Sequence, residues 1–286
     1  MLGAIGDLVE DVVVRLHGAI NLASDTDAEV TRRRGGSAAN VVEAAARDGA
    51  AARFIGQVGD DPTGRWLTGV LEAFGAECAV RRAGRSGTIV VLVDHDGERT
   101  MLCDRGACTH LAEPDPAWLD GLHTLHIPYY SLVGEPLAGT SATLAQWANA
   151  RGITVAVDTS SAALLQAAGS GPALARIAAL RPRVVLANEL EAEVLGDGLL
   201  ALDAVVVVKH GAGPAMVHQP GAAPVAVPAE QVAEVRDTTG AGDAFAAGFL
   251  TSLAGGAGAV AATTEGHRVA AATVRRVSAA TRAAGS

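Results

Sequence analysis

The sequence has few aromatic residues, few cysteines and no excess of positive charge. Aromatic residues make up 3% of the 286 positions, so the core must rest on Ala, Val and Leu. The formal net charge of -9 argues against binding nucleic acid by phosphate neutralisation, and we expect no nucleic-acid partner. The three cysteines lack the spacing of a zinc site, and free thiols are typical of a reducing compartment.

Targeting and membrane signals are also lacking. The first residues have no basic segment followed by an apolar run, so they do not read as a signal peptide. Charged residues, proline or glycine interrupt every long apolar stretch, so we expect no membrane partner and a cytoplasmic location. There is no GxxxxGK[ST] sequence either, which disfavours the P-loop class of nucleotide-binding proteins.

What the chain does contain is an alternation of short apolar runs with longer helical segments. We expect helices at 38–47, 63–74 and 141–150, and strands at 53–58, 122–127, 153–158, 184–187 and 205–208. This order predicts an α/β fold, Rossmann-like, with a mostly parallel central sheet flanked by helices. No linker or repeat divides the chain, so we expect residues 1–286 to form a single α/β domain.

Two segments, at about 9–34 and 86–108, break this alternation. Both contain alternating apolar and polar residues, and the second turns at Asp96-Gly97, a strong hairpin signal. Such strands suit a small antiparallel sheet that acts as a lid over a site at the strand ends. A hairpin without a role at the site is the alternative. An exposed sheet edge would also permit a homodimer through the lid.

The most informative segment places Gly240, Ala241 and Gly242 directly before Asp243 at the start of a predicted helix. Glycine permits close backbone approach, and the first N–H groups of a helix form a site for anions. A carboxylate beside such an anion hole suits a general base, which takes a proton from a hydroxyl that attacks a bound phosphoryl group. The alternative is that Asp243 merely caps the helix.

Two other helix starts carry polar residues. Asn40, after the glycine pair Gly35-Gly36, is placed either to hydrogen-bond a polyol or to face solvent at a tight turn. Asn188 and Glu191 stand three residues apart after a strand. An amide and a carboxylate there would either orient Mg²⁺ and its waters around nucleotide phosphates or cap the helix.

Taken together, these segments carry a family resemblance. The run from Asp237 to Phe245 resembles the C-terminal signature of the ribokinase-like (PfkB) carbohydrate kinase family. Residues 35–40 look like the N-terminal signature of that family, 56–64 follow at the usual place, and 188–191 look like its NxxE motif. The resemblance implies a ribokinase fold with a small β-sheet lid, and a kinase that transfers the γ-phosphoryl group of ATP with Mg²⁺.

The resemblance also implies roles for single residues. Asp243 matches the catalytic base, and Gly240, Ala241 and Gly242 match the anion hole. Positions that match the acceptor site are Asp11, Gly35, Gly36 and Asn40. Positions that match the nucleotide site are Asn188, Glu191, Lys209, Gly211 and Gly213. Glu191 matches the Mg²⁺-organising carboxylate, and Asp237 and Thr239 stand where some members bind a monovalent cation, so a K⁺ site is left open.

Arg105 follows the second lid segment and has two interpretations. The similar region of 2-keto-3-deoxygluconate kinases also carries an arginine, which favours a contact between Arg105 and a carboxylate or hydroxyls of the acceptor. The alternative is a surface ion pair with Asp104 or a nearby acid.

The acceptor itself is expected to be a small sugar or sugar acid. Aromatic side chains that would stack on a purine are sparse, which disfavours the first alternative, a nucleoside kinase of the adenosine kinase type. The second alternative is a regulator that binds a nucleotide or sugar without catalysis. The intact run from Gly240 to Asp243 argues against it.

Overall fold

A central sheet of nine strands organises the chain, whose computed structural model describes residues 1–94, 96 and 98–284. Seven adjacent strands run parallel, and the two strands at one edge are joined to them and to each other by antiparallel pairings. In spatial order they are β13 (Val225–Val227), β12 (Ala215–His218), β11 (Val205–Lys209), β10 (Val184–Asn188), β9 (Thr154–Asp158), β8 (Thr124–Pro128), β1 (Leu2–Ile5), β4 (Ala52–Val58) and β5 (Glu77–Arg82). The prediction of a mostly parallel central sheet is confirmed.

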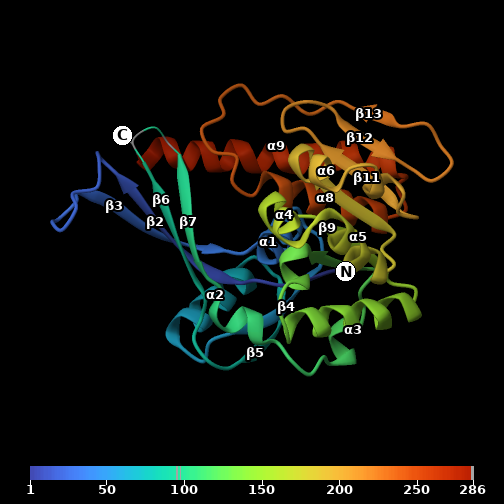
Figure 1. Cartoon of the computed structure of the whole chain (residues 1–286), viewed down its shortest axis with the longest axis horizontal. Helices are drawn as coiled ribbons and strands as arrows, with labels where there is room; N and C mark the ends of the chain where they lie inside the picture. The colour runs from blue at the N-terminus through green and yellow to red at the C-terminus, as the bar shows by residue number, and fades with distance from the viewer. Residues whose placement is uncertain (95, 97, 285–286) are drawn as a thin grey trace.

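Helices cover both faces of this sheet (Figure 1). One face carries α1 (Ser37–Arg47), α2 (Pro62–Ala73), α8 (Ala241–Ala254) and α9 (Ala259–Ala284). The other carries α3 (Leu137–Ala150), α4 (Ala162–Ala168), α5 (Ser170–Ala179), α6 (Glu189–Leu195) and α7 (Asp197–Leu200). Alternate residues of each strand enter opposite cores: in β10, Val184 and Leu186 pack on the first face, and Val185 on the second. Aliphatic strands buried on both sides explain how a core forms with so few aromatic residues.

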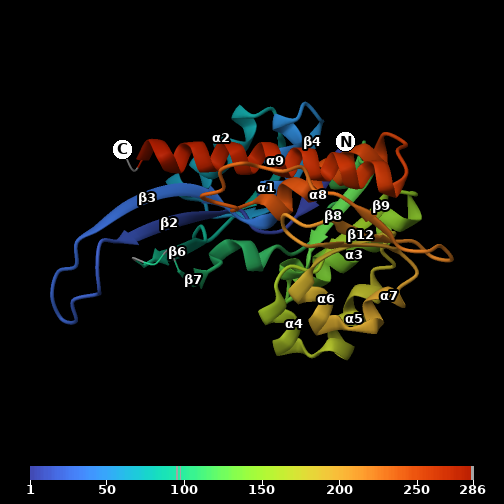
Figure 2. The same cartoon turned by 90° about the horizontal axis from the view of Figure 1, so that it is seen from above.

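A smaller sheet of four strands projects from one side of the molecule (Figure 2). Its order is β3 (Ala28–Gly35), β2 (Val9–Leu16), β6 (Thr88–Val93) and β7 (Arg99–Asp104). β6 and β7 pair antiparallel, as the hairpin signal predicted, although Gly97 of the predicted turn lies outside the described residues. The expectation of a wholly antiparallel sheet is wrong, because β2 and β6 run parallel. These two strands come from separate hairpins, and a long crossover through the main domain joins them.

Most predicted elements appear within a few residues of their expected bounds. The largest shift is α3, which begins at Leu137 and not at the predicted residue 141. Gly139 and Thr140 are weak helix formers, so the local sequence predicts a later start for the helix. Burial of Leu137 stabilises the earlier start. Among the described residues, no helix is long and apolar enough to cross a membrane.

Candidate active site

The first turn of α8 forms an anion-binding site. Gly240 is its N-cap and has a φ of 76°, a left-handed conformation that glycine adopts without strain. A Cβ atom at Gly240 would meet open space, so the helix start is accessible rather than packed. The N–H groups of this turn and the positive end of the helix dipole therefore favour a bound phosphate.

Asp243 lies in that first turn and contacts α1. Its carboxylate accepts hydrogen bonds from Ser37 Oγ and Asn40 Nδ2, each at 2.7 Å. Within the described residues α8 has no side-chain cap, so the interpretation of Asp243 as a capping residue is not supported. Burial raises the pKa of Asp243 from 3.8 to about 6, and nearby Asp158 adds to the rise, while Ser37, Asn40 and Lys209 oppose it. A carboxylate with that pKa is ionised at neutral pH and still accepts a proton readily.

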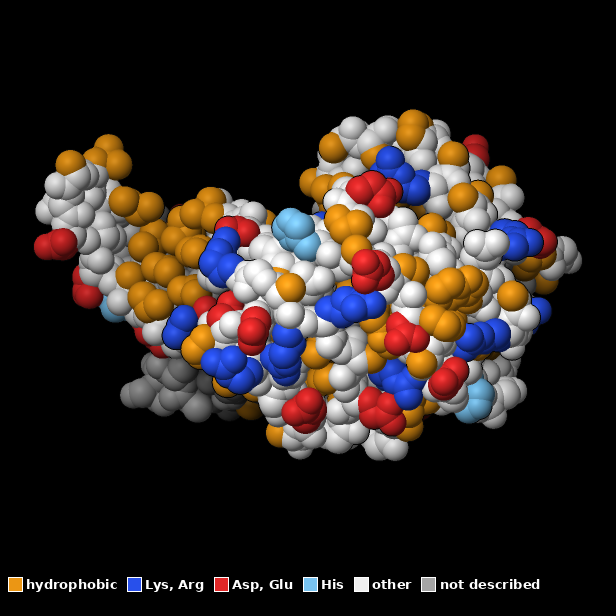
Figure 3. Space-filling view, turned by 90° about the horizontal axis from the view of Figure 1, so that it is seen from below, with side chains coloured by type: hydrophobic (Ala, Val, Ile, Leu, Met, Phe, Trp, Pro, Cys, Tyr) orange, Lys and Arg blue, Asp and Glu red, His pale blue; other side chains and the backbone are white. Residues whose placement is uncertain are grey.

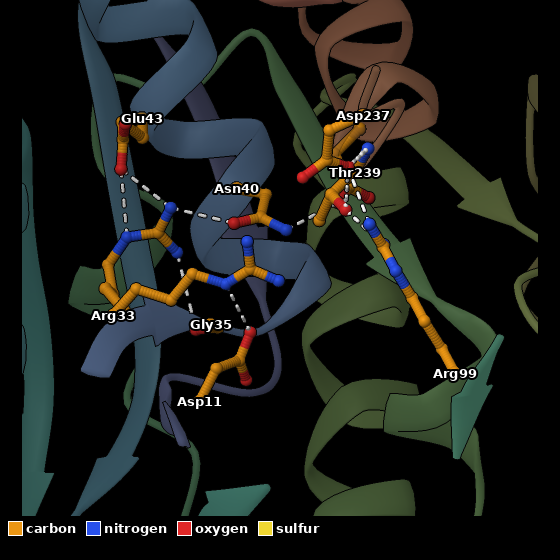
Figure 4. A network of polar contacts seen from close by, with 10 residues as sticks. Asp11, Arg33, Gly35, Asn40, Glu43, Arg99, Asp237 and Thr239 are labelled. Carbon is orange, nitrogen blue, oxygen red and sulfur yellow. Dashed lines mark hydrogen bonds and ion pairs between the residues drawn. The ribbon is translucent and has the colours of Figure 1, made fainter. Parts of the chain in front are cut away.

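The predicted acceptor residues Asp11, Gly35 and Asn40 lie close together (Figure 4). Asn40 links Asp243 to Arg34, whose Nη2 donates to Asn40 Oδ1 at 2.8 Å, so Asn40 does not face solvent. Gly36, the N-cap of α1, has a φ of 104°, and a Cβ there would collide with the carbonyl oxygen of Asp7. Burial raises the pKa of Asp11, although Arg33 and Arg34 act in the opposite direction. Asp11, Asn40 and Gly240 line a cavity of about 260 Å³.

A second cavity, of about 420 Å³, is lined by residues that were predicted for the nucleotide site. The predicted residues Asn188, Lys209 and Gly211 line it. Gly213 instead lies in a turn where its N–H donates to the carbonyl of His210 at 2.8 Å. Sequence reasoning missed the apolar wall of this cavity, formed by Val232, Val235, Ala270, Ala271 and Val274. The small aliphatic residues of α9 form no motif in the sequence, because they line this cavity only through the position that α9 takes in the fold.

The two cavities meet at the start of α8. Thr239 and Gly240 line the smaller cavity, whereas Ala241 and Gly242 line the larger one. A phosphate held at this helix start therefore lies between a small-molecule cavity and a nucleotide-sized one. The geometry suits transfer of a phosphoryl group from one ligand to the other.

A buried ion pair, between Lys209 and Asp158, stands next to this junction. Lys209 Nζ donates to Asp158 Oδ2 at 2.8 Å, and a Cβ placed on Gly242 would lie 3.7 Å from Nζ. Burial alone would raise the pKa of Asp158, but Lys209 holds it below its ordinary value. Burial would likewise lower the pKa of Lys209, but Asp158 holds it above its ordinary value. The pair is therefore ionised at neutral pH. The sequence predicted the strand that ends at Asp158 but gave this carboxylate no role.

Asn188 and Glu191 form a capping box at the start of α6. Asn188 Oδ1 accepts from the Glu191 N–H, and Glu191 Oε2 accepts from the Asn188 N–H, each at 2.9 Å. The capping alternative is confirmed, but Glu191 is 4% exposed rather than solvated. Burial and the charge of Asp158 raise the pKa of Glu191. Asp158 and Glu191 are thus two neighbouring buried carboxylates, and Lys209, which pairs with Asp158, lines the larger cavity.

Asp237 and Thr239 contact the small sheet. Arg99 of β7 donates from Nη1 to Thr239 Oγ1 at 2.6 Å and from Nη2 to Asp237 Oδ1 at 3.0 Å (Figure 4). Burial would raise the pKa of Asp237, but hydrogen bonds from Thr239 and Arg99 lower it. The loop before the anion hole is therefore tied to the small sheet by a guanidinium group.

Arg105 forms a two-pronged ion pair with Asp7. Its Nε and Nη2 lie 2.7 and 2.8 Å from the two carboxylate oxygens, and Nη2 also donates to the carbonyl of Tyr130 at 3.0 Å. Asp104, the partner that the alternative interpretation named first, pairs with Arg85. A contact between Arg105 and an acceptor stays a prediction.

Comparison with known proteins identifies the class. The pfkB family carbohydrate kinase model matches residues 4–284, so the chain belongs to that family. A ribose-1-phosphate kinase of Halopiger xanaduensis is 34% identical over 235 residues, which cover 80% of this chain and 77% of that protein. A fructokinase of Klebsiella pneumoniae is 31% identical, covering 82% of this chain and 81% of that one. The crystal structure of adenosine kinase from Sinorhizobium meliloti has the same fold, with a TM-score of 0.84, 24% identity, and coverage of 96% and 93%.

Proposed function

We propose that this kinase transfers the γ-phosphoryl group of ATP to a hydroxyl of a small sugar or sugar acid. The observation that carries the proposal is the junction at α8, where two cavities meet beside Asp243 and the anion hole. ATP occupies the larger cavity, with its phosphates over Gly240 and Gly242. The acceptor occupies the smaller cavity against Asp11, Gly35, Gly36 and Asn40.

The reaction is a single displacement at the γ-phosphorus. The acceptor oxygen forms a bond to phosphorus as the bond to the β–γ bridging oxygen breaks, and ADP leaves with that electron pair. Asp243 Oδ takes the hydroxyl proton, and Ser37 and Asn40 hold the carboxylate in place. The α8 N–H groups and the Lys209 ammonium stabilise the charge that develops on the transferred group.

The residues around Glu191 fit a magnesium ion that enters with the nucleotide. No set of three or more His, Cys, Asp or Glu side chains in the described part of the chain is placed to hold a metal by itself. Mg²⁺ usually keeps several waters and binds few carboxylates together with substrate phosphates, so Asn188 and Glu191 would hold it largely through waters. When bound, the ion neutralises phosphate charge. Burial, and after it the charge of Asp158, raises the pKa of Glu191, and a bound cation would oppose both effects.

A monovalent cation such as K⁺ at Asp237 and Thr239 must compete with the Arg99 guanidinium for the same oxygens. We therefore expect K⁺ to stimulate the wild-type enzyme little, and Arg99→Gln to become K⁺-dependent by about threefold or more, since the variant leaves Asp237 without its cationic partner. Rates measured in K⁺ and in the same concentration of Na⁺ test this. Equal K⁺ stimulation of both proteins would contradict the competition.

The choice of acceptor rests on the lining of the smaller cavity. Among the described residues that line this cavity, Phe74 is the single aromatic one. The Arg47 guanidinium lies 3.7 Å from the centre of the Phe74 ring, so that face of the ring is occupied. A purine base would find no open stacking partner there, which favours a sugar over a nucleoside. The named relatives, a ribose-1-phosphate kinase and fructokinases, agree with a sugar acceptor. A nucleoside kinase is the second candidate.

The small sheet, built from the predicted lid segments, is proposed to close over the acceptor. Its face toward the site carries Asp11, Arg33 and Arg99, and closure would exclude water from the transfer step. By strand register, the opposite face carries Val12, Val14, Val30, Val90, Leu92 and Leu102. Figure 3 shows apolar side chains gathered on this projecting part.

An apolar sheet face of this kind suits a homodimer formed lid to lid. We expect light scattering to give the mass of two chains. A mass of 28.7 kDa at all concentrations would contradict the dimer.

The test of the kinase proposal is ATP consumption with Mg²⁺ across sugars, sugar phosphates, sugar acids and nucleosides. Turnover that depends on a sugar-type acceptor supports it. Turnover on nucleosides alone supports the second candidate. ATP binding without turnover on any acceptor would contradict both and support a non-catalytic regulator.

A further inference from the structure

Four arginines converge in the smaller cavity. Arg33 and Arg34 come from β3, Arg47 from the last turn of α1, and Arg276 from α9, so residues far apart in sequence supply the charge. We call this set the arginine pocket. The whole chain carries a net charge of -9, so such a concentration of positive charge is contrary to the overall balance.

The cations in the arginine pocket outnumber the anions. Glu43 is shared: its Oε2 lies 2.7 Å from Arg34 Nη2 and its Oε1 lies 2.7 Å from Arg47 Nε. Arg33 has a looser partner, since its Nε lies 3.5 Å from Asp11 Oδ2. Four guanidinium groups against the carboxylates of Asp11 and Glu43 leave two positive charges unbalanced.

Arg276 is the arginine of the pocket whose positive charge is least compensated. Among the residues that the structure describes, its side chain has no hydrogen bond or ion pair, although it lines the cavity. Partial burial and then the neighbouring charge of Arg47 lower its pKa, with Arg34 adding to the effect and Glu43 opposing it. An arginine remains charged regardless, and a bound anion would relieve the part of this effect that comes from Arg47 and Arg34.

The arginine pocket is also close to the reacting groups. Asn40 donates to Asp243 and accepts from Arg34, so a single amide separates the catalytic base from the first guanidinium. Thr239 and Gly240, at the anion hole, line the same cavity. An anionic group a few bonds from the acceptor hydroxyl would therefore reach the arginines while the hydroxyl faces Asp243.

We propose that the arginine pocket binds the phosphate group of the acceptor, so that the substrate is a phosphorylated sugar. The proposal rests on the proposed kinase function and narrows its acceptor class. A phosphate monoester is nearly dianionic at neutral pH and matches the two unbalanced charges, whereas a sugar acid brings a single charge. Guanidinium groups are also well suited to phosphate oxygens, which they bind with paired hydrogen bonds.

The experiment compares ribose 1-phosphate, ribose 5-phosphate and fructose 6-phosphate with ribose, fructose and gluconate. The readout is the ratio of kcat/KM for the best sugar phosphate to that for its parent sugar. We expect a ratio of roughly 100 or more in the wild type, and a roughly 10- to 100-fold smaller ratio in Arg276→Gln, from the loss of a charge-assisted contact. Arg276 is exposed, so its replacement should not disturb folding. Arg268→Gln removes the same charge from α9 at an exposed ion pair with Asp48 and serves as the matched control, with an unchanged ratio.

Calorimetric titration of the same compounds without ATP separates this proposal from the kinase proposal. Binding of a sugar phosphate that weakens in Arg276→Gln and not in Arg268→Gln supports the arginine pocket even if no acceptor is phosphorylated. A kinase that uses the parent sugar as well as its phosphate, or prefers gluconate, overturns the pocket assignment and leaves the kinase intact. A phosphate preference that Arg276→Gln does not alter overturns it as well.

Discussion

The Asp243→Asn enzyme is expected to lose about 10²- to 10⁴-fold in kcat, because the acceptor hydroxyl loses the base that takes its proton. Asparagine has nearly the same size and can still accept the hydrogen bond from Ser37 Oγ, so the first turn of α8 should keep its position. The measurement is steady-state kinetics with the best acceptor, beside calorimetric titration with ATP. Nucleotide affinity should change little, since the larger cavity is lined by Ala241 and Gly242 and not by Asp243.

Asp237→Asn provides the control for this result. Asp237 lies before the same helix and bonds Arg99 and Thr239, but it does not contact the proposed base. A variant at Asp237 should therefore retain much more activity than Asp243→Asn. If Asp243→Asn keeps more than about a tenth of the wild-type kcat, the assignment of the general base is wrong.

The pKa of Asp243 gives this prediction a pH dependence. Burial raises that pKa to about 6, so kcat/KM of the wild type should fall as the pH drops through 6, where the base becomes protonated. The residual rate of Asp243→Asn should lack this acid limb. An acid limb that persists in the variant would show that another group is responsible.

The same shift predicts a change in stability. A carboxyl group whose pKa is raised on folding stabilises the folded state while it is protonated, and this contribution is lost as the pH rises from 3.8 to about 6. The variant at Asp243 should therefore melt progressively higher relative to the wild type between pH 4 and pH 7. Thermal melts across that range measure the difference, and its absence would mean that the carboxyl is not perturbed.

The sequence predicted the parts of the site that local geometry encodes. In the run from Gly240 to Asp243, the helix start needs a glycine at its left-handed N-cap and an open first turn. Both features can be predicted from these four consecutive residues. The end of β10 and the start of α6 could be predicted in the same way, because Asn188 and Glu191 satisfy each other across three residues. Such motifs do not depend on the rest of the fold.

The contacts that these motifs make with other parts of the chain could not be predicted, because they join segments that are distant in the sequence. Asp243 meets Ser37 across 206 positions, and Arg99 meets Asp237 across 138. The arginine pocket depends on α8 packing against both α1 and α9, an arrangement that no local pattern specifies. The parallel pairing of β2 with β6 was missed for the same reason, because α1, β4, α2 and β5 separate the two hairpins in the sequence.

Removing the charge of Asp158 is expected to have the largest effect on stability. Asp158→Asn leaves the Lys209 ammonium buried next to a neutral amide, and breaking a buried pair in this way typically costs about 3–5 kcal/mol of unfolding free energy. His126 is fully buried with a pKa lowered to about 4 by burial, so it is neutral and adds no second positive charge beside Lys209. Asp243 and Glu191 are close enough to compensate partly, so we expect about 2–4 kcal/mol by urea unfolding.

The pH range of this contribution follows from both partners. The pKa of Asp158 is lowered on folding, so its stabilisation is present above its ordinary value of 3.8 and is lost as the pH falls through the lower folded value. The pKa of Lys209 is raised, so its stabilisation is present below 10.5 and is lost as the pH rises beyond the higher folded value. The difference between wild type and Asp158→Asn should therefore be constant across neutral pH.

Replacing both partners separates the structural role of the pair from its role at the phosphates. The double variant Asp158→Asn/Lys209→Met buries no unpaired charge, so it should recover most of the lost stability, because a buried ion pair and an apolar replacement are often close in free energy. The turnover of the double variant should nevertheless be about 10²-fold lower than that of the wild type, since the ammonium group beside Gly242 no longer stabilises the transferred phosphoryl group. A double variant as unstable as the single one would show that the lost stability does not come from the unpaired charge of Lys209. A stable double variant with full activity would show that Lys209 holds the strand end in place and takes no part in transfer.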